Sequence, residues 1–191
     1  MLLHQYQHQE ELSQGNPNEW ALECEYHAGV ILFGMDSSLE CFVFAINSLG
    51  FAKYPDEFCN ITDPRFLKRI GPKNILGGDQ SDKLNPRPGY HNHFRRMVAL
   101  WKQSDSLLST IFEYHDVAKH RSAVVQGGRL GEVRIRDNPK QPGILMSSTL
   151  HTLQSLTREY QKFVDELLPI ALEESAIAFG YTLVKKSPGS A

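Results

Sequence analysis

Apolar residues recur every three or four positions over four stretches of the chain, which is the spacing of amphipathic α-helices. The stretches cover residues 17–50, 90–101, 106–120 and 148–171. In the third, His115 continues the apolar stripe of Ile111 and Phe112. In the second, four apolar side chains share one helix face, namely Tyr90, Phe94, Met97 and Trp101. Asn16 and Pro17 fit an N-cap followed by a first helical residue, and Gly50 stands where a C-cap glycine belongs. The pattern predicts an all-α fold, a bundle of about five or six helices.

The first stretch has a competing interpretation. Ser37-Ser38-Leu39-Glu40 fits a capping box, which would begin a helix near Ser38 and leave residues 27–35 as a strand. Gly29 and Gly34 each weaken a continuous helix by roughly 1 kcal/mol relative to alanine. We favour the helix, because glycines also allow two helices to approach closely.

Two other regions depart from the helical pattern. Residues 51–89 are rich in proline, glycine, aspartate and asparagine, and only a short helix capped by Asp63 is expected there. Residues 132–136 alternate with period two and precede the turn signal Pro142-Gly143, so a small β-hairpin is expected near residues 130–147.

The size and composition predict a single domain over residues 1–191, with residues 1–16 as a loose arm and residues 185–191 as a disordered tail. Twenty basic residues against 22 acidic ones give a net charge of −2, so any nucleic-acid contact needs a local basic patch. The three cysteines have no metal-binding spacing and favour the reducing cytoplasm. Apolar runs such as residues 30–33 are far too short to span a bilayer, which predicts no membrane association.

The third helical stretch ends in a group of residues that suits phosphodiester chemistry. Asp116 and His120 are four residues apart and share a helix face, so the carboxylate can fix which imidazole nitrogen carries the proton. Lys119 is four residues from His115, and Arg121 adds a fixed positive charge. One imidazole could take a proton from a ribose 2′-hydroxyl, the other could protonate the leaving oxygen, and the cations could stabilise the phosphorane.

The same residues also have a purely structural interpretation. Positive side chains near a helix C-terminus are favoured by the helix dipole by about 0.3–1 kcal/mol. Asp116 would then form an ordinary surface pair with Lys119 or His120, and His115 would be a core histidine with one nitrogen satisfied.

The segment from Tyr114 to Arg121 resembles the motif of the HEPN superfamily of helical bundle proteins. In that motif an arginine, a polar residue, three further positions and a histidine lie on one helix. His115 stands in the place of the arginine, Asp116 is the polar residue and His120 is the closing histidine. The segment 38–50 is similar to an early core helix of such proteins.

This resemblance implies a homodimer in which two copies of the motif face each other across a cleft. Active relatives are metal-independent endoribonucleases, while others bind nucleotides or are inactive partners. It assigns His115, Asp116 and His120 to catalysis and Lys119, Arg121 and Tyr114 to binding. Histidine in place of arginine removes a permanent forked cation, which favours a binding or degenerate form of the site.

Other polar residues offer weaker sites. His91 and His93 are two residues apart and point to different faces of a helix, so they make a poor metal pair. Asp36 and Glu40 share one face of an apolar helix, where they could hold a cation, orient the histidines or form a polar edge. We expect neither a metal nor a cofactor.

Two functions follow from this pattern. The leading one is a HEPN-like protein that binds RNA or a nucleotide, with a metal-independent ribonuclease as its enzymatic form. The alternative is a non-catalytic protein–protein interaction module. The first expects His115 and His120 to line a cleft reached by solvent, and the second expects them to be dispersed or buried, with an exposed apolar patch elsewhere.

Overall fold

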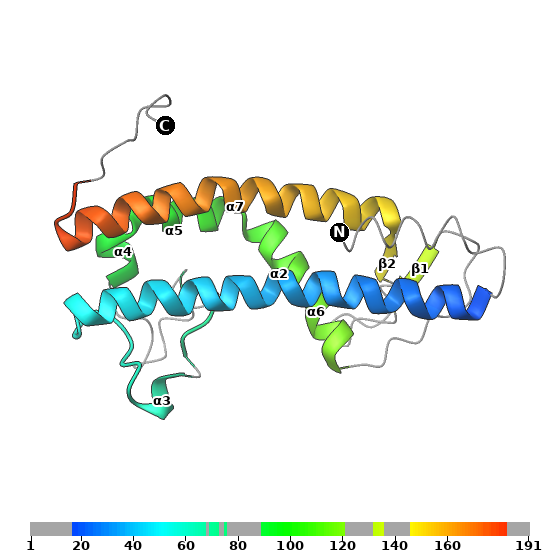
Figure 1. Ribbon diagram of the computed structural model, residues 1–191, viewed down its shortest axis with the longest axis horizontal. Helices are drawn as coiled ribbons and strands as arrows, with labels where there is room; N and C mark the ends of the chain where they lie inside the picture. Colours follow the sequence, from blue (N-terminus) through cyan, green and yellow to red (C-terminus); the bar gives the residue numbers. More distant parts are fainter. Residues whose placement is uncertain are drawn as a thin grey trace, which may run out of the picture. The chain divides into compact units, whose positions relative to one another are not determined.

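The computed structural model describes residues 17–67, 69–72, 75, 89–120, 132–135 and 146–182. Figure 1 shows the elements in chain order. They are α2 (Pro17–Lys53), α3 (Pro64–Leu67), α4 (Gly89–His93), α5 (Arg95–Gln103), α6 (Asp105–His120), β1 (Glu132–Ile135), β2 (Met146–Thr149) and α7 (Leu150–Phe179). The predicted all-α fold is confirmed. The expected arm, the tail and the loop 76–88 lie outside the described residues.

The first helical stretch is one helix, α2, and the alternative strand over residues 27–35 is wrong. The regular apolar spacing outweighs the cost of Gly29 and Gly34, which stand in open space on the helix. The expected end at Gly50 is also wrong, because α2 continues to Lys53. Gly50 instead allows the Phe58 ring to approach the helix backbone closely, since a Cβ there would lie 2.5 Å from Cε1 of Phe58.

A glycine does end the last helix. Gly180, with φ of 77°, follows α7, and its N–H donates to the carbonyl oxygen of Ile177 at 3.0 Å. The N–H of Tyr181 donates to the carbonyl oxygen of Ala176 at 2.8 Å. These two bonds form a Schellman motif, which requires the left-handed conformation that glycine adopts freely. Pro169 lies inside α7, and the helix continues beyond it.

The chain divides into two compact units, and each is described by itself. Unit 1 comprises residues 1–37 and 106–162, and unit 2 comprises residues 38–105 and 163–191. The division falls within α2 and within α7, so each long helix contributes to both units.

Unit 1 is built on a small apolar cluster from three helices. Leu32 and Met35 of α2 pack with Ile111 of α6 and Leu156 of α7. Partly buried side chains surround this cluster, namely Ile31, Leu107, Tyr114 and Tyr160. The Tyr160 hydroxyl lies 3.3 Å from the carbonyl oxygen of Met35, to which it donates. Within the same unit, β1 pairs antiparallel with β2, at the position expected for the hairpin.

Unit 2 buries the apolar face predicted from residue 90 onward. This face consists of Tyr90, Phe94, Met97 and Trp101, all of them buried. The helix is interrupted at Phe94, which separates α4 from α5. Trp101 packs edge-on against Phe163 of α7, with ring centroids 5.5 Å apart. Figure 1 shows α5 beside the C-terminal half of α7.

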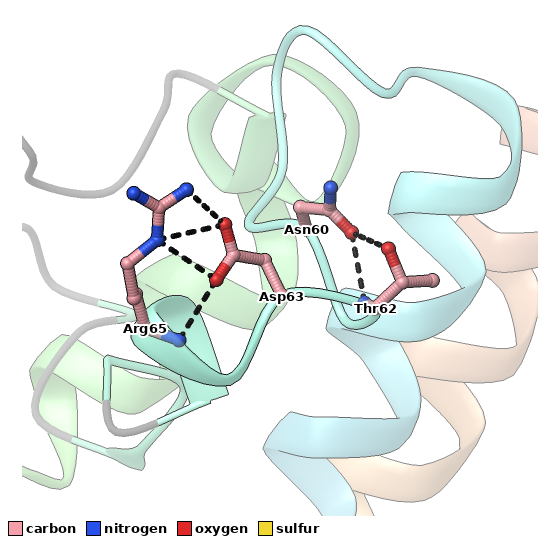
Figure 2. A network of polar contacts seen from close by, with 4 residues as sticks. All are labelled: Asn60, Thr62, Asp63 and Arg65. Carbon is pink, nitrogen blue, oxygen red and sulfur yellow. Dashed lines mark hydrogen bonds and ion pairs between the residues drawn. The ribbon is translucent and has the colours of Figure 1, made fainter.

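The loop after α2 is ordered by its own polar side chains, which Figure 2 shows. Oδ1 of Asn60 accepts hydrogen bonds from the N–H and the hydroxyl of Thr62, at 2.8 and 2.7 Å. Asp63 caps α3 as predicted, because its Oδ1 accepts from the N–H of Arg65 at 3.0 Å. Its carboxylate also binds the Arg65 guanidinium, which lowers the pKa of Asp63 below its ordinary value.

One described segment, Tyr26–Lys53, is long and apolar enough to cross a membrane by length and composition. The most apolar 18-residue window of this segment has a mean hydropathy of 1.7, and 33% of that window is buried within the protein. The core helix of a soluble protein meets the same criterion. The expected lack of membrane association and the cytoplasmic location stay predictions.

Candidate functional site

The central feature of unit 1 is a buried pair between His115 of α6 and Asp36 of α2. Nδ1 of His115 lies against Oδ2 of Asp36. Both side chains are about nine-tenths buried, with 7% and 10% of their surface exposed. Because a carboxylate can only accept a hydrogen bond, Nδ1 carries the proton and the tautomer of His115 is fixed.

Helix periodicity explains how the two residues meet. Met35 of α2 and Ile111 of α6 belong to the same buried cluster of unit 1. Asp36 directly follows Met35 in the chain. His115 follows Ile111 by four residues and therefore continues the buried face of α6, as the sequence predicted. The tertiary contact brings Asp36 to it across the helix pair. The sequence offered Asp36 only as one of several acidic residues that could orient a histidine.

The second nitrogen of His115 has no hydrogen-bond partner among the described residues. Nε2 is buried and makes no hydrogen bond, and among the described side chains only Nδ1 of His27 shares that condition. A buried polar atom without a partner costs free energy, so it requires an explanation. With Nδ1 protonated, Nε2 presents a lone pair that can accept a proton or a hydrogen bond.

One exposed aromatic side chain contacts this imidazole. The Phe33 ring packs edge-on against His115, with centroids 5.6 Å apart and planes inclined by 62°. Phe33 is 57% exposed, so it connects a buried imidazole with the protein surface. Sequence reasoning missed Phe33 as a site residue, because its place in an apolar stretch of α2 reads as core.

The other predicted site residues divide into two groups. Tyr114 is partly buried against the core cluster of unit 1, and burial, with a smaller effect of Glu113, raises the pKa of its hydroxyl. Asp116, Lys119 and His120 lie on the last turns of α6, as predicted, but their side chains are outside the described ones. Arg121 lies outside the described residues. Of the six predicted residues, the structure therefore places only the side chains of Tyr114 and His115.

The expectation of a solvent-reached cleft does not hold for His115, which is buried. What the structure provides instead is an oriented imidazole inside the helix packing, with an exposed ring against it. A carboxylate at Nδ1 fixes the tautomer and the orientation of a histidine ring.

The histidines of α4 belong to a different set of contacts, in unit 2. Nε2 of His93 lies 3.2 Å from Oε2 of Glu57, and the amide of Asn92 donates to the same oxygen at 2.8 Å. The His93 ring stacks on Tyr54, with centroids 3.9 Å apart. The hydrogen bond from Asn92 lowers the pKa of the Glu57 carboxyl, and the contact with His93 lowers it further. These residues join the end of α2 to α4.

No three histidine, cysteine, aspartate or glutamate side chains converge on one point among the described residues. Of the described cysteines, Cys41 is exposed and Cys59 is buried.

Comparison of the chain with protein-family models, with curated proteins and with solved structures finds no match.

Proposed function

We propose that this chain is a HEPN-like protein that binds RNA or a nucleotide around His115. The observation that supports the proposal is the Asp36–His115 pair, which orients the imidazole and leaves Nε2 without a partner. Nε2 is the atom that would accept a proton from a ribose hydroxyl or, once protonated, donate to a phosphate oxygen. Asp36 would stabilise the imidazolium formed in the first case.

Sequence charge supplies a second argument. From Lys119 to Lys140 the chain carries six basic residues, Lys119, Arg121, Arg129, Arg134, Arg136 and Lys140. Only two acidic residues, Glu132 and Asp137, stand in the same segment, so its net charge is 6 − 2 = +4. A local positive charge that follows the histidine in the sequence stands out against the overall charge of −2 and suits a phosphate ligand.

The same arrangement suits metal-independent cleavage, in which the 2′-oxygen attacks the adjacent phosphorus and the 5′-oxygen leaves. His115 would take the hydroxyl proton through Nε2, and His120 would protonate the leaving oxygen. The products would be a 2′,3′-cyclic phosphate and a free 5′-hydroxyl. A protein that only binds would hold the same ligand and leave it intact.

Incubation with mixed RNA in the presence of a chelator tests both the ribonuclease and the protein that only binds RNA. Cleavage and binding are measured separately, the latter with 2′-O-methyl RNA, which cannot undergo attack by its 2′-oxygen. His115→Asn is the informative variant, since its amide can still donate to Asp36 while the reactive nitrogen is gone. We expect it to weaken binding and to abolish any cleavage, with folding retained by circular dichroism.

His91→Asn is the matched control, because His91 is an exposed histidine of unit 2. It should bind and cleave as the wild type does. The proposal is wrong if the wild type binds no RNA or nucleotide at low ionic strength, or if His115→Asn behaves like His91→Asn. Loss of cleavage in His120→Ala would assign the second acid, and intact cleavage would remove that role.

We also propose that the protein is a homodimer. Leu168 and Leu172 are four residues apart on α7 and both more than half exposed, so they offer an apolar surface that a second copy would cover. Light scattering over a range of protein concentrations should give twice the monomer mass, and Leu172→Glu should return the protein to a monomer.

A non-catalytic interaction module is the second candidate. It is supported by the burial of His115 and by the same exposed apolar residues of α7. On this alternative the wild type shows no affinity for RNA, and Leu172→Glu removes binding of a different protein. The RNA experiment above therefore separates the two candidates.

A further inference from the structure

The His115 imidazole contacts one buried and one exposed side chain. Among the described residues it makes one polar contact, with Asp36, and one ring contact, with Phe33. Asp36 is about as deeply buried as the imidazole, whereas 57% of Phe33 is exposed. Of these two contacts, therefore, only Phe33 connects the imidazole with the protein surface.

The Phe33 side chain has the freedom that its exposure implies. Leu32 and Met35 of the same helix are buried in the core of unit 1, whereas Phe33 is mostly in contact with solvent. Exposed side chains change rotamer on the picosecond to nanosecond timescale. A change of χ1 would move the Phe33 ring away from the imidazole without any movement of the α2 backbone.

The imidazole keeps one reactive atom unpaired in the closed arrangement. Nδ1 faces Asp36, so the lone pair of the neutral ring is on Nε2. Nε2 is buried and has no hydrogen-bond partner among the described residues, which costs free energy while the site is closed. A state that admits water or a ligand oxygen to Nε2 relieves this cost. The unpaired nitrogen thus favours opening, and the edge-on ring contact favours closure.

We infer that Phe33 is a gate, whose ring holds the His115 site closed in the free protein and turns outward to admit the ligand. The inference concerns regulation of this site, and it rests on the proposed function for the identity of the ligand. A site that is open for only a fraction of the time has its apparent affinity reduced by that fraction, because the ligand binds the open state alone. Such a gate accounts for ligand access to an imidazole of which only 7% is exposed.

Chemical modification measures access to the imidazole directly. Diethyl pyrocarbonate reacts with the unprotonated nitrogen of a neutral histidine, and peptide mapping by mass spectrometry identifies each modified residue. We expect slow modification of His115 in the wild type and at least roughly ten-fold faster modification in Phe33→Ala, because minor conformations are populated at about 0.1–10%. Phe33→Trp keeps a ring at this position and should not accelerate the reaction.

Phe44→Ala is the matched control, since Phe44 is an exposed phenylalanine of α2 in unit 2. It should leave the modification rate of His115 unchanged. The exposed His91 is a reference within every variant and should react equally fast in all of them. Amide hydrogen exchange at Ile111 and Leu156 should stay as in the wild type, because a side-chain gate leaves the helix packing intact.

Binding of 2′-O-methyl RNA supplies a second measurement. Phe33→Ala should bind more tightly than the wild type, by about the same factor as the modification rate increases, because its site is permanently open. If the wild type binds no RNA or nucleotide, the proposed function is wrong, and the modification rates still decide whether Phe33 is a gate.

Three results would overturn the inference. The first is equal modification of His115 in the wild type and in Phe33→Ala. The second is faster hydrogen exchange at Ile111 and Leu156 in Phe33→Ala, which would show that the ring stabilises the helix packing instead of gating the imidazole. The third is weaker RNA binding by Phe33→Ala, which would make Phe33 a ligand contact.

Discussion

The side-chain amide of Asn47 makes two reciprocal hydrogen bonds with the backbone of Cys59. Its Nδ2 donates to the Cys59 carbonyl oxygen at 2.9 Å, and its Oδ1 accepts from the Cys59 N–H at 3.1 Å. Both residues are buried. Asn47, a polar residue on the buried face of α2, thus satisfies the backbone N–H and carbonyl groups of Cys59 in the segment that follows the helix. These bonds explain why an asparagine stands in an apolar pattern.

Replacement of Asn47 by alanine should destabilise the protein by at least about 2 kcal/mol, because each buried backbone group left unpaired costs about 1–3 kcal/mol. Urea denaturation measures this loss in the free energy of unfolding. Asn47→Asp keeps only the acceptor and should also be destabilised. Ser48→Ala, which removes a hydroxyl on the neighbouring position, should change stability by about 0.5 kcal/mol or less. A stable Asn47→Ala variant would contradict this role.

Glu174 of α7 caps the N-terminus of α5. Its carboxylate accepts from the N–H of Arg96 at 2.8 Å and from the N–H of Met97 at 3.1 Å, while Phe94 at the N-cap position makes no side-chain cap. Glu174→Ala should therefore cost about 1–2 kcal/mol in the free energy of unfolding. The adjacent Glu173 pairs with Arg96 at the surface, and Glu173→Ala should cost at most about 1 kcal/mol. Equal effects of the two would argue against the cap.

Two glycines of α2 should respond to alanine in opposite ways. At Gly50 a methyl group would collide with the Phe58 ring, so Gly50→Ala should destabilise by about 1–3 kcal/mol. Gly29 stands in open space, and Gly29→Ala should stabilise by up to about 1 kcal/mol through helix propensity. Melting temperatures measure both. Phe58→Leu should partly rescue Gly50→Ala, and failure to do so would place the strain elsewhere.

Tyr90 makes the fold sensitive to alkali. Burial, assisted by nearby Cys59, raises the pKa of its hydroxyl above the ordinary value of 10.0. The unfolded chain releases this proton first, so the free energy of unfolding should fall as the pH rises above about 10. Urea midpoints from about pH 8 to about pH 11 should fall less steeply in Tyr90→Phe than in the wild type. Tyr181→Phe, at an exposed position, should follow the wild type.

Much of the fold could be predicted from the sequence because helices depend on local spacing. The pattern from residue 90 onward predicted which four side chains would be buried, and Asp63 predicted the cap of α3. The end of the first helix could not be found in this way. Glycine ends a helix in many sequences. Here Gly50 instead makes room for the ring of Phe58, and helix periodicity does not encode that contact.

The same distinction between local spacing and contacts between distant segments applies to the candidate site. Helix periodicity is enough to predict that His115 continues the buried face of α6 beyond Ile111, because three- and four-residue spacing fixes a helix face. The pairing of His115 with Asp36, 79 positions earlier in the chain, and its contact with the Phe33 ring depend on the packing of α2 against α6. Contacts between separate helices depend on which faces pack together, and no spacing within one segment encodes that choice.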